Sequence, residues 1–412
     1  MPVTQSADLL LTNANLATLD PALGSYGIIE QGALLVREGR IQWLGPQQDL
    51  PSLGEVKQAL DCQGQWLLPG FIDCHTHLVF AGNRADEFER RLQGVSYADI
   101  AKQGGGIRRT VSATRQASEA ELLALTLKRA ETLLSQGVTC VEVKSGYGLD
   151  MDTELKMLRV ARQIDKHLPI TVKTTFLGAH ALPIEFQDNA QGYIDKVCQQ
   201  MLPTIAEQQL ADAVDVFCEN IGFSLAHTRQ VFDTARQLGL PVKLHAEQLS
   251  NLGGSELAAE YQALSVDHIE FLSEAGVKAI AQSGTVATLL PGAFYYLKET
   301  QKPPVDLLRK HQVPMAIATD FNPGSSPILN LPLMLNMACT LFALTPLEAL
   351  QGITLNAAKA LGVQKQLGQL KVGMQADMQL LDISHPNQLA YQVGLNPLSR
   401  LWQAGKAIKG GR

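Results

Sequence analysis

Two histidines separated by one residue, His75 and His77, follow an apolar run that begins near Trp66. Successive side chains of a β-strand point to opposite faces, so residues two apart point to the same face. A pair of imidazoles at the end of a strand can hold one divalent metal ion. The same pair could also lie in an ordinary turn, and the residues farther along the chain decide between these interpretations.

Further polar side chains stand at the ends of other predicted strands. In a barrel of parallel strands, functional groups gather at the C-terminal ends of the strands. Three neutral imidazoles and one carboxylate suit Zn²⁺ or iron (Fe²⁺/Fe³⁺) and leave a position for water. We therefore predict one metal site, made of His75, His77, His245 and Asp320.

Such a site suits hydrolysis. A bound metal lowers the pKa of a coordinated water from about 15.7 toward about 7, which supplies hydroxide at neutral pH, and it can polarise a carbonyl. Asp320 could take a proton from the water and hand it to a leaving nitrogen. Two-metal barrels often use a carboxylated lysine at the end of the fourth strand, but here residues 217–220 read Phe-Cys-Glu-Asn. We therefore expect one metal per chain.

The elements that must position these residues form a repeating pattern after residue 60. Apolar runs typical of strands alternate with segments of helical periodicity, and Ser118 with Glu121 forms a capping box before the clearest helix. Eight strands alternating with helices predict a (β/α)₈ TIM-type barrel. An open doubly wound sheet is the competitor, but no Gly-x-Gly-x-x-Gly motif follows a strand. The predicted strands are 66–80, 138–144, 170–177, 213–218, 242–245, 264–269, 285–290 and 314–318.

The two ends of the chain carry short strand patterns and no long helical pattern. The expected strands are 9–19, 32–36 and 40–44 at one end, with 377–383 and 401–407 at the other. We expect both termini to build a small β-sandwich-like domain, with the barrel inserted between them. The predicted division is 1–62, 63–360 and 361–412.

The bulk composition excludes several classes of protein. The 412 residues carry a formal charge of −6 and no basic run, which argues against a nucleic-acid partner. We see no signal-peptide pattern at the start, and no apolar stretch is long enough to cross a membrane. The six cysteines are scattered without a Cys-x-x-Cys motif, so we expect reduced thiols and a cytoplasmic protein.

Taken together, these motifs resemble the amidohydrolase superfamily. The run Pro-Gly-Phe-Ile-Asp-x-His-x-His, the histidines of the fifth and sixth strands and the aspartate of the eighth carry this resemblance. Within the superfamily the chain is more closely similar to the imidazolonepropionase family. The matching segments are 75–84, 104–107, 144–149, 175–180, 245–248 and 320–325.

The resemblance implies a reaction in histidine degradation, in which metal-activated hydroxide attacks the ring carbonyl. The small-molecule substrate 4-imidazolone-5-propanoate and water give N-formimidoyl-L-glutamate. It also implies the predicted metal ligands, a homodimer, and substrate contacts, among which Arg84 could grip the propanoate with a bidentate fork. The implied substrate-binding residues are Arg84, Tyr147, His180, Gln248, Asn322, Gly324 and Ser325.

One position departs from related deaminases and some family members, which have His-x-x-Glu where this chain has His245 followed by Gln248. A glutamine cannot titrate, and the neighbouring Glu247 should point the other way on an extended segment. We therefore expect Gln248 to hydrogen-bond the substrate ring. Proton transfer then falls to Asp320, while His268 steadies the attacking water or the oxyanion.

Two alternatives remain open from the sequence. An aminohydrolase (deaminase) of a nitrogen heterocycle would use the same metal site and release ammonia, although Gln248 and Arg84 count against it. A metal-binding or assembly protein without activity would predict a broken site, and no ligand is missing. The glycine-rich residues 104–106 have two interpretations, a lid over the site or a plain loop.

Overall fold

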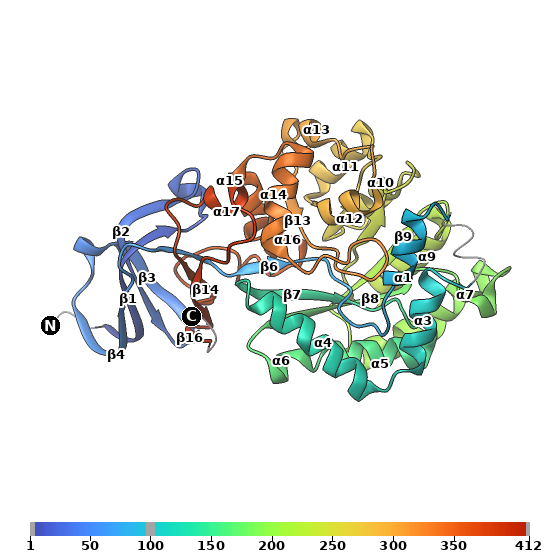
Figure 1. Cartoon of the computed structure of the whole chain (residues 1–412), viewed down its shortest axis with the longest axis horizontal. Helices are drawn as coiled ribbons and strands as arrows, with labels where there is room; N and C mark the ends of the chain where they lie inside the picture. Colours follow the sequence, from blue (N-terminus) through green and yellow to red (C-terminus); the bar gives the residue numbers. More distant parts are fainter. Residues whose placement is uncertain (1–4, 96–103, 409–412) are drawn as a thin grey trace.

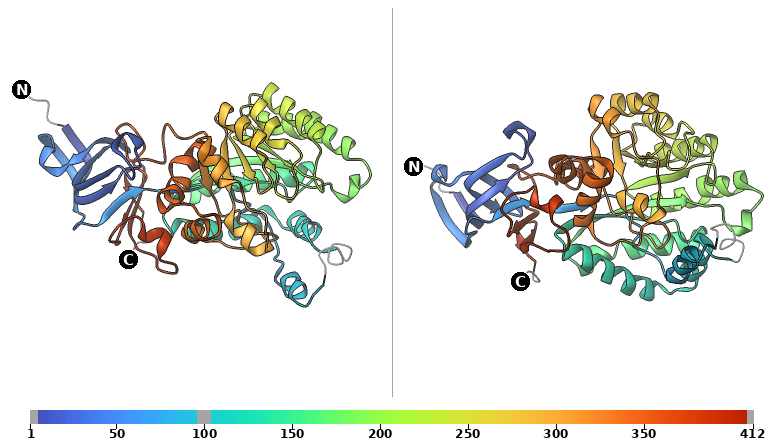
Figure 2. Two further views of the ribbon diagram at one scale, coloured as in Figure 1. Left: turned by 90° about the horizontal axis from the view of Figure 1, so that it is seen from above. Right: turned by 45° about the horizontal axis from the view of Figure 1, so that its top comes forward.

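The computed structural model describes residues 5–95 and 104–408, whose strands form two eight-stranded sheets. One sheet is parallel, follows the chain in order and is wrapped by helices. The other combines strands from both ends of the chain, drawn in dark blue and dark red beside each other in Figure 1. Both views in Figure 2 show this terminal sheet to one side of the helices coloured green to orange.

The parallel sheet is the predicted TIM-type barrel, with neighbouring strands paired in sequence order. Its two edge strands meet through backbone hydrogen bonds just beyond their ends. The amide of Asp320 donates to the carbonyl of His75 at 3.0 Å, and the amide of His77 donates to the carbonyl of Phe321 at 2.9 Å. The strands are β6 (Phe71–Asp73), β7 (Val138–Lys144), β8 (Thr171–Ala179), β9 (Ala213–Cys218), β10 (Leu244–Ala246), β11 (Ser265–His268), β12 (Val286–Leu289) and β13 (Met315–Ile317).

Helices cover the outside of the barrel. The predicted capping box is present at α4, where the Ser118 hydroxyl accepts from the Glu121 amide and the Glu121 carboxylate accepts from the Ser118 amide. The main apolar core lies between the strands and these helices. The longer helices are α1 (Ala85–Leu92), α3 (Ile107–Gln116), α4 (Glu119–Leu134), α5 (Met151–Ala161), α9 (Leu225–Gln237), α11 (Glu274–Ser283) and α14 (Leu331–Phe342).

Shorter helices complete the layer around the barrel and the connection to the terminal sheet. They are α6 (Ile164–His167), α7 (Ala190–Lys196), α8 (Leu202–Glu207), α10 (Gly254–Glu260), α12 (Pro291–Leu297), α13 (Val305–Lys310), α15 (Pro346–Gly352), α16 (Leu355–Ala360) and α17 (Gln388–Tyr391).

The terminal sheet joins the two ends of the chain around an apolar core of its own. Its strands run in the order β16, β15, β14, β5, β1, β2, β3, with β4 beside β1. β4 is not among the predicted strands, because its side chains are mostly exposed and lack an apolar pattern. The bounds are β1 (Gln5–Ala17), β2 (Ile28–Arg37), β3 (Arg40–Pro46), β4 (Leu53–Asp61), β5 (Trp66–Pro69), β14 (Met378–Leu381), β15 (Leu398–Gln403) and β16 (Lys406–Ala407).

The first predicted barrel strand, 66–80, is wrong as a single element. Gly70 divides it into β5, which pairs with β1 and β14 in the terminal sheet, and β6, which pairs with β7 in the barrel. A Cβ on Gly70 would lie 2.3 Å from the hydroxyl oxygen of Thr139, so only glycine fits at this crossing point. We propose that the barrel domain starts at Gly70 and not at residue 63. Residues 361–412 stay the predicted C-terminal part of the small domain.

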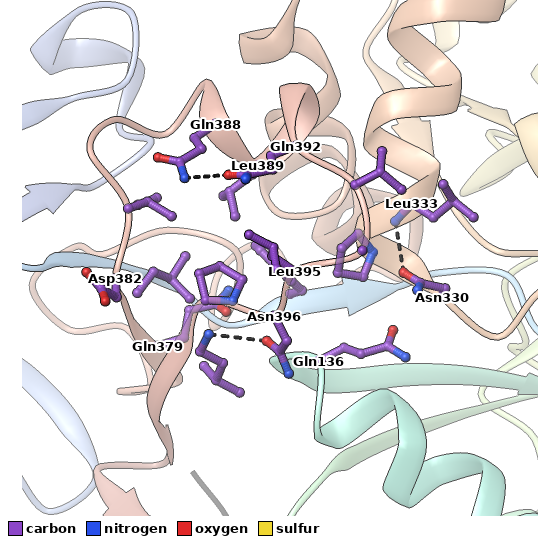
Figure 3. A pocket seen from close by; sticks show the side chains of 18 of the residues that line it. Gln136, Asn330, Leu333, Gln379, Asp382, Gln388, Leu389, Gln392, Leu395 and Asn396 are labelled. Atoms are coloured by element: carbon purple, nitrogen blue, oxygen red, sulfur yellow. Dashed lines mark hydrogen bonds between the residues drawn. The ribbon is translucent and has the colours of Figure 1, made fainter. Parts of the chain in front are cut away.

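A cavity of about 490 Å³ lies where the barrel meets the terminal sheet (Figure 3). Its wall includes Gln136, just before β7, so it stands at the opposite end of the barrel from the histidines. The carboxamides around it hold the local backbone and one another. Asn330 caps α14 by accepting from the Leu333 amide at 2.9 Å, and Gln388 donates to Gln392 at 2.7 Å. These contacts explain the amide-rich lining as structural.

Two further observations concern the whole described chain. The six cysteines are all unpaired, and five of them are buried. Among the helices of residues 5–95 and 104–408, none has the length and apolar character needed to span a membrane.

Candidate active site

The four predicted metal ligands meet at the C-terminal ends of the barrel strands. His75 and His77 follow β6, His245 lies in β10, and Asp320 follows β13. The ring centroids of His75 and His245 are 4.5 Å apart, and those of His75 and His77 are 5.4 Å apart. Asp320 Oδ1 lies 3.4 Å from Nε2 of His75 and 3.5 Å from Nε2 of His77. The closure of the barrel has therefore brought residues 245 positions apart in the chain into one cluster.

The donor atoms of this cluster suit a metal ion. His75 is fully buried, and its Nδ1 lies 2.7 Å from the carboxylate of Asp267. Its Nε2 has no satisfactory hydrogen-bond partner among the described residues, so a buried lone pair faces the cluster. Burial lowers the pKa of His77 to about 4, which keeps that ring neutral and able to coordinate. Burial alone would raise the pKa of Asp320, but contacts with His75 and His77 hold it well below its usual range.

His268 stands against the same cluster, at the end of β11. Its ring centroid is 5.4 Å from that of His245 and 5.9 Å from that of His75. Ligand atoms of His75, His245 and His268 lie within 4.8 Å of one another, and so do those of His75, His77 and Asp320. Burial lowers the pKa of His268 to about 3, so the imidazole is neutral near pH 7. A neutral ring in this place can donate or accept one hydrogen bond at the reacting atoms.

Backbone strain accompanies these side chains. Glu247, His268, Ile269 and Asp320 have φ values of 51°, 80°, 65° and 50°, in the left-handed region that non-glycine residues rarely adopt. Such conformations cost on the order of 1–3 kcal/mol each and persist only where the surrounding structure imposes them. At His268 and Asp320 this conformation fixes the direction of side chains that face the cluster.

Tyr147 and His180 form an aromatic wall beside His77. The ring of His180 stacks on His77 with centroids 5.5 Å apart and 18° between the planes, and Tyr147 lies 5.3 Å from His180. Nδ1 of His180 lies 2.9 Å from the carbonyl of Gly146 and donates to it, which leaves Nε2 as an acceptor. Burial lowers the pKa of His180 to about 3, so the ring is neutral near pH 7.

The loop after β13 has a fixed shape that its own side chains impose. The Asn322 carboxamide oxygen accepts from the amides of Gly324 and Ser325 at 2.7 and 2.8 Å, and its nitrogen donates to the carbonyl of Asp320 at 2.7 Å. A Cβ on Gly324 would lie 2.6 Å from the guanidinium of Arg84, so Arg84 lies directly against this loop. Arg84 also donates from Nε to the hydroxyl of Thr110 at 3.0 Å.

Gln248 and Glu247 follow β10 and have different surroundings. Gln248 is half-buried, and its side chain makes no hydrogen bond to the part of the chain that the structure describes. Glu247 is fully buried and turned toward α10, where its carboxylate accepts from the amides of Gly254 and Ser255 at 2.7 and 3.1 Å. It therefore serves as the cap of a helix whose N-cap residue, Gly253, has no side chain.

The glycine-rich segment 104–106 is anchored at one end. The Gly106 amide donates to both carboxylate oxygens of the buried Glu87, at 3.1 and 3.2 Å. Arg109 on α3 pairs with Asp86 on α1. These contacts link α1 to α3 on either side of the chain between them; whether the segment acts as a lid stays a prediction.

Several residues that shape the site had no role assigned from the sequence. Glu154 on α5 accepts backbone hydrogen bonds from Gly146, Gly148 and Leu149, at 2.8–3.2 Å, and so holds the loop that carries Tyr147. Asp215 and Asp267 lie behind the ligand histidines. Asp215 and Asp267 could have been recognised in the sequence as carboxylates within apolar strands, because buried charged groups are rare unless they are paired.

Comparison with known proteins agrees with this geometry. The model of the amidohydrolase family matches residues 66–410. An imidazolonepropionase from Colwellia psychrerythraea is 63% identical over 403 residues, which cover 97% of this chain and 96% of that protein. One from Shewanella baltica is 58% identical over 405 residues, covering 98% and 99%. The chain belongs to the imidazolonepropionase family of the amidohydrolases.

Membership in the imidazolonepropionase family is consistent with the shape of the molecule. An adenosine deaminase from Xanthomonas campestris, solved with bound zinc, superimposes with a TM-score of 0.74 and covers 98% of this chain and 93% of its own. The two proteins share 20% of their residues, so this likeness shows the fold alone. The barrel with an added sheet is thus an architecture already seen among amidohydrolases.

The support that Glu154 gives to the Tyr147 loop can be tested by amide hydrogen exchange. In Glu154→Ala, the buried amides of Gly146, Gly148 and Leu149 lose their acceptor, and each such group costs about 1–3 kcal/mol. We expect their exchange to quicken by at least about tenfold relative to the rest of the barrel. Glu121→Ala, which removes an exposed capping residue of α4, is the matched control and should leave these amides as protected as before. Unchanged protection in Glu154→Ala would contradict the assignment.

Proposed function

We propose that this chain hydrolyses 4-imidazolone-5-propanoate to N-formimidoyl-L-glutamate, the ring-opening step of histidine degradation. The observation that carries this proposal is full-length similarity, at 58–63% identity, to imidazolonepropionases, joined to a buried cluster of histidines and an aspartate at the barrel ends. A deaminase activity is not favoured, since an adenosine deaminase and a 5-methylcytosine deaminase of the same fold are only 20% and 17% identical to this chain. Product analysis with fresh substrate separates the two, because a deaminase would release ammonia.

The residues that would hold the metal are His75, His77, His245 and Asp320. A divalent ion bound there lowers the pKa of a water molecule and polarises a carbonyl. The donor set accepts Zn²⁺ and iron alike, so we propose one of these two metals without choosing between them. The end of β9, where two-metal barrels carry a modified lysine, has Cys218 and no lysine, which supports a single ion.

We assign the proton transfers of the reaction to side chains of the protein. In the reaction a water oxygen adds to the ring carbonyl, the carbon–nitrogen bond breaks, and the released nitrogen takes a proton. Asp320 lies at the centre of the cluster and is the group that we assign to receive the water's proton and return it to the nitrogen. His268, neutral and partnerless at Nδ1 among the described residues, can hydrogen-bond the developing oxyanion or the water.

Substrate recognition falls to the groups around the metal cluster. The guanidinium of Arg84 presents a fork of N–H donors beside the loop 322–325, which suits the propanoate carboxylate. His180 and Tyr147 offer an aromatic wall for the planar ring. Gln248 can both donate to and accept from the ring amide. We propose that the loop residues Asn322, Gly324 and Ser325 also bind the substrate.

We propose that the enzyme is a homodimer in the cytoplasm. A homodimer is the commonest closed assembly of soluble enzymes. A cytoplasmic location is supported by the six unpaired cysteines, since free thiols are typical of reducing compartments.

The metal site predicts one ion per chain. His245→Ala and Asp320→Ala should each lose the metal and the activity together, because each removes one of four ligands. Elemental analysis of the purified variants measures this, with His167→Ala on α6 as an exposed control that keeps the wild-type content. Two tightly held metals per active chain, or full occupancy in both variants, would show that the ligand set is wrong.

The proposed clamp on the propanoate predicts a binding defect in Arg84→Ala. Loss of a charge-assisted contact of about 1.5–3 kcal/mol corresponds to an increase in KM of about 10- to 150-fold. Arg84→Lys should restore only part of this, since a lysine lacks the bidentate geometry. Arg109→Ala, an arginine on the neighbouring helix paired with Asp86, should keep the wild-type KM. An unchanged KM in both Arg84 variants refutes the clamp.

The division of labour between Gln248 and His268 predicts two different kinetic defects. Gln248→Ala should weaken binding and lower the rate moderately without altering the shape of the pH–rate profile, since glutamine does not titrate. His268→Ala should lower kcat by about 10²–10⁴-fold, the range typical of a positioned acid–base or oxyanion group. Measurement of kcat and KM against pH for both variants, together with their metal content, distinguishes the two defects. Equal inactivation of both variants with metal and fold intact would be contrary to this division.

A further inference from the structure

Five charged side chains are buried together beneath the ligand histidines. Lys144 and Glu142 lie on β7, Asp215 on β9 and Asp267 on β11, while Lys243 immediately precedes β10. Each of the five has no solvent exposure. The cluster thus joins β7 to the three neighbouring strands β9, β10 and β11 through three carboxylates and two ammonium groups.

Lys144 is the member that contacts the carboxylates behind two different ligands. Its Nζ donates to Asp215 Oδ2 at 2.7 Å and lies 3.7 Å from Asp267 Oδ2. The same oxygen of Asp215 lies 3.0 Å from Nδ1 of His245. The same oxygen of Asp267 lies 2.7 Å from Nδ1 of His75. One ammonium group therefore stands behind a carboxylate–imidazole pair on each side.

Lys243 has a different position in the cluster. Its Nζ donates to Glu142 at 2.8 Å and to the carbonyl of Cys74 at 3.0 Å, and it is 3.9 Å from Asp267. It thus fixes the backbone just before His75, whereas Lys144 bridges two carboxylates that face two ligand rings. Glu142 Oε1 accepts from both lysines and from the hydroxyl of Thr175, and Oε2 of Glu142 lies 2.9 Å from the Nζ of Lys144.

We propose that Lys144 is a positioning residue for the metal centre, which holds Asp215 and Asp267 so that His245 and His75 present Nε2 to the same point. A carboxylate that accepts from Nδ1 of a ligand histidine sets the tautomer and the orientation of the ring. The carboxylates in turn need a positive partner in a site without water, because an unpaired buried charge is strongly unfavourable. Lys144 supplies that partner directly to Asp215 at 2.7 Å, and it shares Asp267 with Lys243, since the two Nζ atoms lie 3.7 and 3.9 Å from that carboxylate. Of the two lysines, Lys144 is the one that lies near both carboxylates.

The inference rests on the proposed metal site, and metal affinity is its direct readout. Metal is withdrawn from the wild-type holoenzyme and from Lys144→Met by titration with a chelator of known affinity. Disruption of the partners of ligand histidines typically weakens metal binding by about 10- to 100-fold, and we expect a loss in this range. Lys144→Arg keeps the charge and should recover most of the affinity.

The matched control is Lys156→Met. Lys156 on α5 is a part-buried ammonium, whereas Lys144 is fully buried, and it donates to the carbonyls of residues 114, 115 and 117 and contacts no proposed metal ligand. Its loss should lower the unfolding midpoint and leave the affinity for metal unchanged. If Lys144→Met does not fold, Lys144→Gln, which keeps a donor but loses the charge, is measured by the same criteria.

A double-mutant cycle tests whether Lys144 influences the metal affinity through Asp215. If Lys144 acts through Asp215, the loss of affinity in Lys144→Met/Asp215→Asn should be smaller than the product of the two single losses. Wild-type affinity in Lys144→Met, an equal loss in Lys156→Met, or losses that multiply in the double variant would each overturn the inference. A wild-type protein that retains no metal in the titration would instead overturn the proposed metal site itself.

Discussion

The closure of the parallel barrel is the constraint on which the active site depends. Beyond the ends of β6 and β13, the chain continues for a few residues as a backbone ladder, in which Asp320 donates to His75 and His77 donates to Phe321. These two hydrogen bonds join the first strand to the last. Without them, the carboxylate and the two histidines would lie at opposite edges of an open sheet. The same bonds that complete the fold therefore set the distances within the metal cluster.

The site also shows how buried polar groups are stabilised where function needs them. Four imidazoles and a carboxylate have almost no solvent exposure, and Nδ1 of His75 lies 2.7 Å from the carboxylate of Asp267. Burial keeps the pKa values of His77, His180 and His268 low, so these rings are neutral near pH 7. Behind them the lysines and carboxylates compensate one another. Asp320 and His268 also have left-handed backbone conformations. The free-energy cost of these conformations is offset by the packing of the surrounding barrel.

The sequence predicted the barrel because it depends on local patterns, and the assignment of the metal ligands stays a prediction. Strand periodicity located all eight barrel strands, and the position of polar residues at strand ends grouped His75, His77, His245 and Asp320. The division at Gly70 could not be predicted in this way, since β5 and β6 form one apolar run and only tertiary pairing separates them. The support from Glu154 and Lys144 was likewise hidden, because it depends on which side chains meet across the fold. The roles of the substrate-binding residues stay predictions.

The pairing of β5 with β14 has a consequence for how the chain is made. Leu67 pairs with Leu380, so one side of β5 receives its partner only after more than 300 further residues have been synthesised. During that interval, one edge of β5, the apolar strand that leads into His75, has backbone groups without their final hydrogen-bond partners. Such edges favour wrong pairing and aggregation in growing chains. The terminal sheet can therefore be completed only after the last strand of the barrel has been synthesised.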